Sequence, residues 1–233
     1  MTGTPDSELP VTLLVVAKAP VPGLAKTRLA AGLGGDTGAD TAAHLAADLA
    51  AAALLDTLDA VADTPAAARV VALTGDLDAA CRAAELRDRL AGFTVIGQRG
   101  GDFAERLANA HADAAAAGPV LQIGMDTPQV SPALLADCAR SLLVVPAVLG
   151  PAADGGWWIV GVRDGAAADC LRTVPMSRPD TGVLTLAALR AGCTEVALLP
   201  ELRDVDTVDD VAAVSAECAP GSRFAAATTA VVG

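Results

Sequence analysis

Aromatic residues and lysine are scarce in this sequence. Phe and Trp together make up only 2% of its 233 residues, tyrosine is absent, and the only lysines are Lys18 and Lys26. With so few rings, a buried core has to be built from Ala, Val and Leu, which requires many close contacts between helices and sheet. Hydrophobic residues reach 53% of the chain, so such a core can form and a disordered chain is excluded.

The marks of a secreted or membrane protein are also missing. The N-terminus has no basic segment followed by an apolar run, as a signal peptide would have. No apolar stretch reaches the roughly 20 residues that span a bilayer. The five cysteines (Cys81, Cys138, Cys170, Cys193 and Cys218) are scattered without a C-x-x-C pair, which is typical of reduced core residues. We therefore expect a cytoplasmic protein.

Negative charge dominates the chain. The formal net charge is −12 and the isoelectric point is about 4.4. An acidic surface repels nucleic acid and anionic membranes, so we expect neither as a partner. An anionic ligand would have to be held by a local cluster of positive charge.

Apolar runs that resemble buried strands alternate with amphipathic helical patterns along the chain. This alternation predicts an α/β fold, with a mostly parallel sheet covered by helices on both faces. We expect one domain over residues 11–217, a flexible lead over residues 1–10, and a C-terminal tail over residues 218–233 that the patterns leave unassigned. Strands are predicted at residues 11–17, 69–74, 93–97, 119–124, 142–149, 157–162 and 196–199, and helices at 39–61, 76–90, 102–117, from 131 onward and at 207–216.

Both lysines fall in the loop after the first predicted strand, which runs from Ala17 to Leu29 and also holds Gly23 and Arg28. Parallel sheets place their ligand crevice at this end of a strand. Three cations, a glycine and a helix start suit a polyphosphate, although a solvated basic turn is the alternative. A P-loop is excluded because Gly23 and Lys26 lack the required spacing.

Acidic residues follow two later strands. Asp126 comes directly after the strand at 119–124, where its carboxylate would point into the same crevice. Mg²⁺ or Mn²⁺ is usually held by one or two carboxylates together with substrate phosphates. Asp204 and Asp206 share one face of an extended segment and could reach the same ion. The alternatives are an Asx-turn at Asp126 and a helix cap at Asp206.

Three further segments are candidates for substrate contacts. The loop at 150–156 carries Asp154 and Gly155 and leads into Trp157 and Trp158. On a strand these tryptophans point to opposite sides, so that one could stack on a substrate while the other enters the core. A hairpin loop with a core tryptophan is the alternative. The remaining two segments are the turn Arg99-Gly100-Gly101, for a base or ribose, and the cation Arg178, for an acceptor's phosphate or carboxylate.

His44 and His111 lie in predicted helices without a paired acid, so a Ser–His–Asp or Cys–His nucleophile is unsupported.

Five motifs, in order, resemble the DUF2064 family of GT-A-type transferases: AKAPVPGLAKTRL, QRGGDFAERLANA, IGMDTPQ, GPAADGGWWIVG and LRDVDTVDDV. This family is similar to the 2-phospholactate guanylyltransferases and, more distantly, to the molybdenum-cofactor nucleotidyltransferases. The resemblance covers about residues 11–215. It implies a three-layer α/β/α fold with a twisted, mostly parallel GT-A-type sheet.

The resemblance also implies roles for individual residues. Lys18, Lys26 and Arg28 match the basic loop that cradles phosphates, and Asp126 and Asp206 match the metal-binding acids. Asp154 matches the acid of an A-D-G-G-Y-Y motif, with tryptophans in place of the usual tyrosines. Val208 replaces a usual proline, and residues 175–182 depart from the family's common P-W-S-T form.

We therefore expect a metal-dependent transferase that takes a nucleoside triphosphate or a nucleotide sugar, plus a small-molecule acceptor. Nucleotidyl transfer to a phosphorylated or phosphonate acceptor is favoured, because a three-cation loop suits a triphosphate. A glycosyltransferase is the first alternative, and a non-catalytic nucleotide-binding protein is the second. Lys26 and Arg28 would neutralise charge in the transition state, and Asp154 would orient the acceptor or act as a base. We expect a monomer or homodimer.

Overall fold

The computed structural model describes residues 8–232, apart from the side chains of residues 35–37, 117 and 230–232. Most of the expected flexible lead lies outside these residues, and its last two residues already belong to the first strand. The strands are β1 (Leu9–Lys18), β2 (Ala66–Thr74), β3 (Thr94–Gly97), β4 (Val120–Ile123), β5 (Ala147–Pro151), β6 (Trp157–Val162) and β7 (Val196–Leu198).

These strands form one seven-stranded sheet in the order β3-β2-β1-β4-β6-β5-β7. β6 runs antiparallel to β4 and β5, whereas the other neighbouring strands pair in parallel. The sheet is thus mixed, with one reversed strand in a mostly parallel set. As a result, the carboxyl ends of β1, β4, β5 and β7 and the amino end of β6 all meet at one edge.

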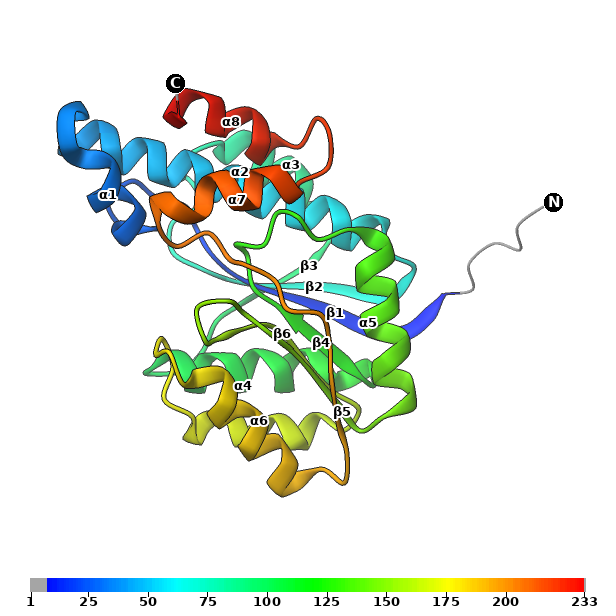
Figure 1. Ribbon diagram of the computed structural model, residues 1–233. Helices are drawn as coiled ribbons and strands as arrows, with labels where there is room; N and C mark the ends of the chain where they lie inside the picture. Colours follow the sequence, from blue (N-terminus) through cyan, green and yellow to red (C-terminus); the bar gives the residue numbers. More distant parts are fainter. Residues whose placement is uncertain (1–7, 233) are drawn as a thin grey trace.

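Helices cover both faces of the sheet and confirm the three-layer α/β/α architecture (Figure 1). One face packs on α2, α3 and α5 in a first core cluster that includes Leu54, Leu86 and Leu135. The other packs on α4, α6 and η2 in a second cluster that includes Leu107 and Leu189. The helices are α1 (Thr27–Thr37), α2 (Ala39–Asp63), α3 (Ala83–Leu90), α4 (Phe103–Ala114), α5 (Pro132–Val144), α6 (Thr181–Gly192), α7 (Val208–Glu217) and α8 (Arg223–Val232), with 3-10 helices η1 (Ala115–Ala117) and η2 (Gly165–Thr173).

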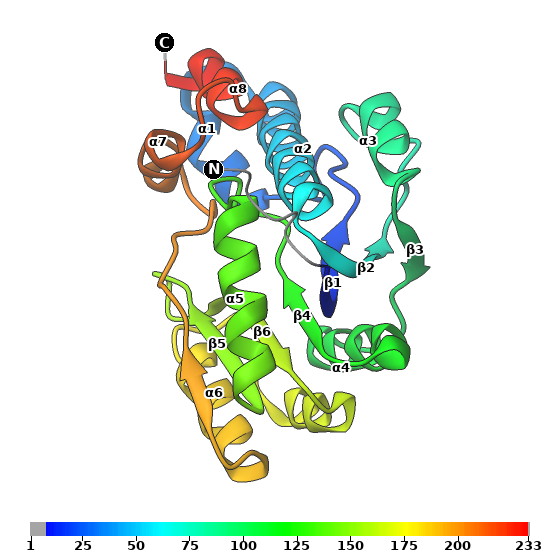
Figure 2. The same cartoon turned by 90° about the vertical axis from the view of Figure 1, so that its right-hand side faces the viewer.

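The C-terminal tail, which the sequence left unassigned, forms helix α8 and packs with α1 and α7 against α2 (Figure 2). Phe224 of α8 is fully buried in this cluster with Leu29, Leu49 and Val214. The carboxylate of Asp56 in α2 accepts hydrogen bonds from the backbone N–H groups of residues 223 and 224 at 3.0 and 2.8 Å. Residues 223–232 of the tail therefore form a helix that packs on the rest of the chain.

Several predicted boundaries were wrong. The run at residues 142–149 was predicted to be one strand, but α5 continues to Val144 and β5 begins only at Ala147. Helix α3 was predicted from residue 76, but it begins at Ala83 after Arg82, whose φ of 51° is left-handed and interrupts the helical backbone. Helix α6 was not predicted. Within residues 8–232, none of the helices has the length and apolar character needed to cross a bilayer.

Candidate active site

A cavity of about 750 Å³ opens at the edge where the strand ends meet. Lys18 lies at the end of β1, Asp126 follows β4, Asp154 lies between β5 and β6, and Trp157 begins β6. Asp206 lies between β7 and α7 and completes this set. The sheet order thus brings together side chains that are far apart in sequence, and the volume falls within the range of small-molecule sites, about 300–1,000 Å³.

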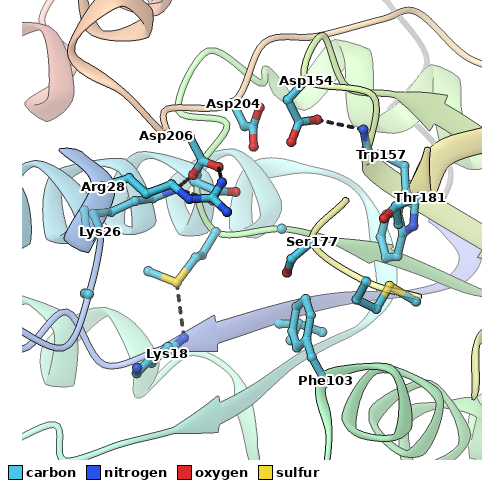
Figure 3. Close-up of a pocket in the computed structure, with 18 of the residues that line it drawn as sticks. Lys18, Lys26, Arg28, Phe103, Asp154, Trp157, Ser177, Thr181, Asp204 and Asp206 are labelled. Carbon is cyan, nitrogen blue, oxygen red and sulfur yellow. Dashed lines mark hydrogen bonds and ion pairs between the residues drawn. The ribbon is translucent and has the colours of Figure 1, made fainter. Parts of the chain in front are cut away.

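Lys26 is the cation that contacts two acidic side chains of this cavity (Figure 3). Its ammonium Nζ lies 2.6 Å from Asp126 Oδ2 and 2.5 Å from Asp206 Oδ1. The lysine side chain is only 13% exposed, and the two aspartates are 28% and 30% exposed. Arg28 adds a longer contact of 3.7 Å to Asp206. The basic loop after β1 therefore faces the acids directly.

Two non-glycine residues of the cavity have a left-handed backbone. Lys26, at the N-cap of α1, has φ and ψ of 47°, and Ser177 has a φ of 59°. This conformation costs a non-glycine residue roughly 1–2 kcal/mol. At Lys26, this strained backbone conformation directs the side chain toward Asp126 and Asp206. The strain therefore lies at a residue of the candidate site.

The segment from β7 to α7 is held against the sheet edge by backbone hydrogen bonds. The amide of Val205 donates to the carbonyl of Asp126 at 3.1 Å, and that of Ala153 donates to the carbonyl of Leu202 at 2.9 Å. The cap of α7 is Thr207, which forms a capping box with Asp210. Asp206 is therefore free of the capping role that the sequence left open, and its carboxylate binds Lys26.

Burial and neighbouring charges shift the pKa values of Lys26 and Asp204. Burial opposes the charge of Lys26, but the charges of Asp126 and Asp206 and their hydrogen bonds outweigh it and raise the pKa of Lys26. Burial, followed by the negative charges of Asp126, Asp154 and Asp206, raises the pKa of Asp204 to about 7. The repulsion between carboxylates that lie this close together is reduced either by a proton on one of them or by a bound cation.

Asp126, Asp204 and Asp206 form a donor set that suits a metal ion. One carboxylate oxygen from each lies within 4.8 Å of the others. Hard divalent cations such as Mg²⁺ prefer oxygen ligands, and they are commonly bound by a few carboxylates plus the oxygens of substrate phosphates. Because the ammonium of Lys26 already bridges two of these residues, the site suits positive charge whether from the lysine or from an ion.

Across the cavity, the loop between β5 and β6 turns tightly at Asp154. Its carboxylate accepts the backbone N–H of Gly156 at 2.7 Å. Gly155 has a left-handed φ of 89°, and a Cβ there would lie 2.0 Å from the carbonyl oxygen of Pro179. Only glycine therefore allows the segment around residue 179 to pack on this loop.

The two tryptophans point to opposite sides of β6, as strand alternation predicts. Trp158 is buried in the first core cluster and donates its indole N–H to the carbonyl of Pro200 at 2.9 Å. Trp157 is half-buried and lines the cavity. It is thus the tryptophan that a ligand would contact.

The remaining cations of the cavity differ in their partners. The ammonium of Lys18 donates to the backbone carbonyl of Leu24 at 2.7 Å. Arg28 extends into solvent, with its side chain 70% exposed. The guanidinium of Arg178 forms two hydrogen bonds, at 2.9 and 3.0 Å, with the carboxylate of Asp180.

Several candidate residues do not line the cavity: Ala17, Gly23, Arg99, Gly100, Gly101 and Gly155. Arg99 forms an ion pair with Asp113, and the backbone N–H of Gly101 donates to Glu105 at the start of α4. The polar groups of the turn from Arg99 to Gly101 are thus bound to side chains of α4. Gly23 and Gly155 lie in loops beside the cavity.

Sequence reasoning overlooked the side chains that wall the cavity on the α4 side. Phe103, in the first turn of α4, is 41% exposed and lines the cavity together with Leu107 and Gln122. The available signal for Gln122 was its polar side chain within the otherwise apolar run of β4. Phe103 carried no signal, because an aromatic residue in the first turn of a helix is ordinary.

Comparison with known proteins defines the family. The model of DUF2064, described as "Uncharacterized protein conserved in bacteria", matches residues 57–178, which is more than half of the chain. The chain belongs to this family. The matched segment of this DUF2064 protein contains Asp126, Asp154 and Trp157, whereas Lys26 and Asp206 lie outside it.

Solved structures agree on the fold. A protein of Desulfovibrio desulfuricans G20, provisionally named a nucleotide-diphospho-sugar transferase, is 26% identical with a TM-score of 0.76, and the match covers 95% of this chain and 96% of that one. A nucleotidyl transferase from Methanothermobacter thermautotrophicus is 17% identical with a TM-score of 0.53, covering 88% and 95%.

The CMP:2-keto-3-deoxy-manno-octonic acid synthetase, solved in complex with CTP, is 14% identical with a TM-score of 0.52, covering 89% and 98%. No curated protein sequence matches the chain. The DUF2064 protein therefore has the GT-A-type transferase fold and is an enzyme of the transferase class.

Proposed function

We propose that this protein is a metal-dependent transferase that acts on a nucleotide-activated substrate, with nucleotidyl transfer as its reaction. The observation that supports this most is the direct contact between the basic loop and the acidic residues. Lys26 bonds to Asp126 and Asp206 at 2.6 and 2.5 Å, at the strand ends where α/β sheets bind their ligands. A metal–polyphosphate complex carries both signs of charge and so matches both groups.

In this proposal the acids and the cations divide the ligand between them. Asp126, with Asp206 or Asp204, would hold Mg²⁺ or Mn²⁺, which when bound neutralises the phosphates and draws electron density from them. Lys18 and Arg28 are accessible to phosphate oxygens, since neither is held in a short ion pair with an acid in the part of the chain that the structure describes. Lys26 would add positive charge where it develops in the transition state, so that positioning and electrostatics supply most of the rate.

Nucleotidyl transfer is preferred because three cations lie on the β1 side of the cavity. In this reaction an acceptor oxygen attacks the α-phosphorus, the bond from that phosphorus to the bridging oxygen breaks, and diphosphate leaves. A triphosphate offers enough negative charge for all three cations. Asp154 lines the cavity and would orient the acceptor or take its proton.

Glycosyl transfer is the second candidate. The Desulfovibrio protein, which is 26% identical, favours it, because that protein is provisionally named a nucleotide-diphospho-sugar transferase. Here an acceptor oxygen would attack the anomeric carbon of the sugar, and a nucleoside diphosphate would leave. The same acids and cations would serve, since this leaving group also carries phosphate charge.

Product analysis distinguishes these reactions. The purified protein is incubated with Mg²⁺ or Mn²⁺, a mixture of candidate acceptors and either each nucleoside triphosphate or each nucleotide sugar, and products are followed by phosphorus NMR. Acceptor-dependent diphosphate release supports nucleotidyl transfer, and a free nucleoside diphosphate released from a sugar nucleotide supports glycosyl transfer. Binding of nucleotide without either product would favour a non-catalytic binding protein. A cytoplasmic location and a monomeric or homodimeric state remain predictions.

A further inference from the structure

On the α4 side the cavity has what we call the apolar wall. Five uncharged side chains line the cavity there: Val16, Phe103, Leu107, Trp157 and Met176. Val16 and Leu107 are buried, Trp157 and Met176 are half-buried, and Phe103 is 41% exposed. Figure 3 shows Phe103 and Trp157 on the opposite side of the cavity from the cations of the basic loop. The exposed and half-buried side chains of this wall are therefore accessible to a ligand.

The backbone that carries part of this wall is held tightly. Residues 175–182 pack on the loop that precedes β6, where the backbone N–H of Gly182 donates to the carbonyl of Gly155 at 2.8 Å. Within the turn, the hydroxyl group of Thr181 donates to the carbonyl of Pro175 at 2.9 Å. The wall is thus largely formed before a ligand arrives, which lowers the entropy that binding costs.

The cations that line the cavity leave none for a charged group at this wall. Among the described residues they are Lys18, Lys26, Arg28 and Arg178. Lys26 binds two aspartates, and Arg178, which was expected to meet a phosphate or carboxylate of the acceptor, binds Asp180. Lys18 and Arg28 belong to the basic loop, which the proposed function assigns to the nucleotide. A phosphate or carboxylate against the apolar wall would therefore be desolvated without a counter-charge, which is strongly unfavourable.

The polar groups beside the apolar wall suit an uncharged partner. Ser177 is exposed and lines the cavity, and in the view of Figure 3 it lies between Phe103 and Asp204. Its hydroxyl group both donates and accepts a hydrogen bond, as the hydroxyl group of an alcohol does. Asp154 also lines the cavity and repels an anion. This side of the cavity thus favours an alcohol over a phosphate or a carboxylate.

The base of a nucleotide has an apolar contact of its own beside the cations. Leu24 lies in the basic loop and lines the cavity, and it is 61% exposed. Its carbonyl accepts the hydrogen bond from the ammonium of Lys18. A nucleotide whose phosphates bind the basic loop can therefore place its base near Leu24, which leaves the apolar wall to the acceptor.

We propose that the acceptor is an uncharged alcohol with an apolar ring, which lies against Phe103, Trp157 and Met176 with its hydroxyl group near Ser177. This rests on the proposed function and replaces the expected phosphorylated or phosphonate acceptor. In nucleotidyl transfer the hydroxyl oxygen forms the new bond to the α-phosphorus. The bond from that phosphorus to the bridging oxygen breaks, diphosphate leaves with the electron pair, and the hydroxyl proton passes to Asp154.

Benzyl alcohol and benzyl phosphate test this class, because they differ only in the phosphate. Each is titrated into the nitrogen-15-labelled protein with Mg²⁺ and inorganic diphosphate, which compete for the basic loop. The chain has two tryptophans, so NMR shows two indole N–H signals, and Trp158, which is buried and bonded to Pro200, is the internal control.

We expect benzyl alcohol to shift the Trp157 signal more than the Trp158 signal. We also expect it to bind about tenfold more tightly than benzyl phosphate. Equal or tighter binding of benzyl phosphate, or no binding of benzyl alcohol, overturns the proposal.

Phe103→Ala supplies the second measurement. The Phe103 ring is exposed and lies 5.6 Å from the guanidinium of Arg106, so we expect the variant to fold and to bind benzyl alcohol about tenfold more weakly. Val183→Ala is the matched control, since it removes an apolar side chain that is 71% exposed on α6 and lies outside the cavity. It should keep the wild-type affinity.

Wild-type affinity in Phe103→Ala, or an equal loss in both variants, contradicts the proposal. If Phe103→Ala unfolds, Phe103→Leu gives the same test, because it keeps an apolar side chain and removes the ring; wild-type affinity there also contradicts the proposal.

Uncharged nucleosides test the other possible occupant of the apolar wall. Adenosine, guanosine, cytidine and uridine are each added to the complex with benzyl alcohol. We expect none of them to displace it. Displacement together with a shift of the Trp157 signal would place the base on the apolar wall and overturn the proposal.

These titrations need no turnover, so they are independent of the product analysis. If benzyl alcohol binds as expected but no nucleotide substrate reacts, the proposed transferase reaction fails and the alcohol site stands. If a nucleotide substrate reacts only with phosphorylated acceptors, the reaction stands and the assignment of an uncharged acceptor fails.

Discussion

Replacing Lys26 by methionine tests whether its ammonium holds the acidic residues together. Methionine has similar length and the same left-handed strain, so the change removes the charge and little else. Removing one partner of a buried ion pair costs 3–5 kcal/mol. Because Asp126 and Asp206 keep 28% and 30% exposure, water recovers part of this, and we expect a loss of about 2–3 kcal/mol, which corresponds to a Tm lower by ~4–12 °C.

The same variant should respond more strongly to metal. With the ammonium gone, Mn²⁺ is free to neutralise Asp126 and Asp206, so it should bind Lys26→Met more tightly than the wild type and restore most of the lost Tm. Thermal unfolding with and without Mn²⁺ measures both effects in the absence of nucleotide. Lys18→Met is the matched control, since this ammonium donates a hydrogen bond to the carbonyl of Leu24 and is in no ion pair with an acid among residues 8–232, and the Tm of this variant should change little.

A variant at Lys26 with wild-type stability and an unchanged response to Mn²⁺ would refute this reasoning. It would mean that the lysine and the ion do not share Asp126 and Asp206.

Three further predictions concern pH and the C-terminal helix. Because the pKa of Asp204 is about 7, a metal ion that uses Asp204 as its second carboxylate needs the ionised form. The affinity for Mn²⁺, measured by calorimetry, should then fall by about tenfold per pH unit below 7 and level off above it, whereas an ion held by Asp126 and Asp206 without Asp204 should show no such fall. The pKa of His111 is about 4 in the folded protein and about 6.5 in the unfolded chain, so the unfolded chain binds the proton first as the pH falls. Urea unfolding should therefore show a loss of up to about 3 kcal/mol in the free energy of unfolding between pH 6.5 and pH 4. His111→Leu should lessen this loss. Asp56→Ala removes the carboxylate that caps α8, which should cost about 1–2 kcal/mol and speed hydrogen exchange of the α8 amides, whereas unchanged exchange would contradict the capping role.

The sequence predicted the sheet better than the helix boundaries. β1, β4 and β6 are buried runs whose composition has few other interpretations, and each was placed to within two residues at either end. The boundary between α5 and β5 was predicted wrongly because the residues on both sides of Pro146 are apolar, so hydrophobicity does not mark where the helix ends. The reversal of β6 follows from the short connection to β5 and not from its own residues.

The sequence could predict which candidate site residues lie at the ends of strands, but not the contacts between their side chains. Lys18 ends one buried strand and Asp126 comes shortly after another, and parallel strands end at one edge. The contacts of Lys26 join it to residues 100 and 180 positions later, so they depend on the packed tertiary structure and not on local patterns. The turn at Arg99, suggested for a base or ribose, lies outside the cavity, and its polar groups bond to Asp113 and Glu105 of α4.

Calorimetric titration of nucleotide, with and without Mn²⁺, tests the central claim most directly, namely that the basic loop and the acidic residues form one metal–nucleotide site. The account predicts that a nucleoside triphosphate or nucleotide sugar binds the wild type only when metal is present, and that Asp126→Ala abolishes this binding while its Tm shows that it remains folded. Equal nucleotide binding without metal, or full metal-dependent binding by Asp126→Ala, would contradict it.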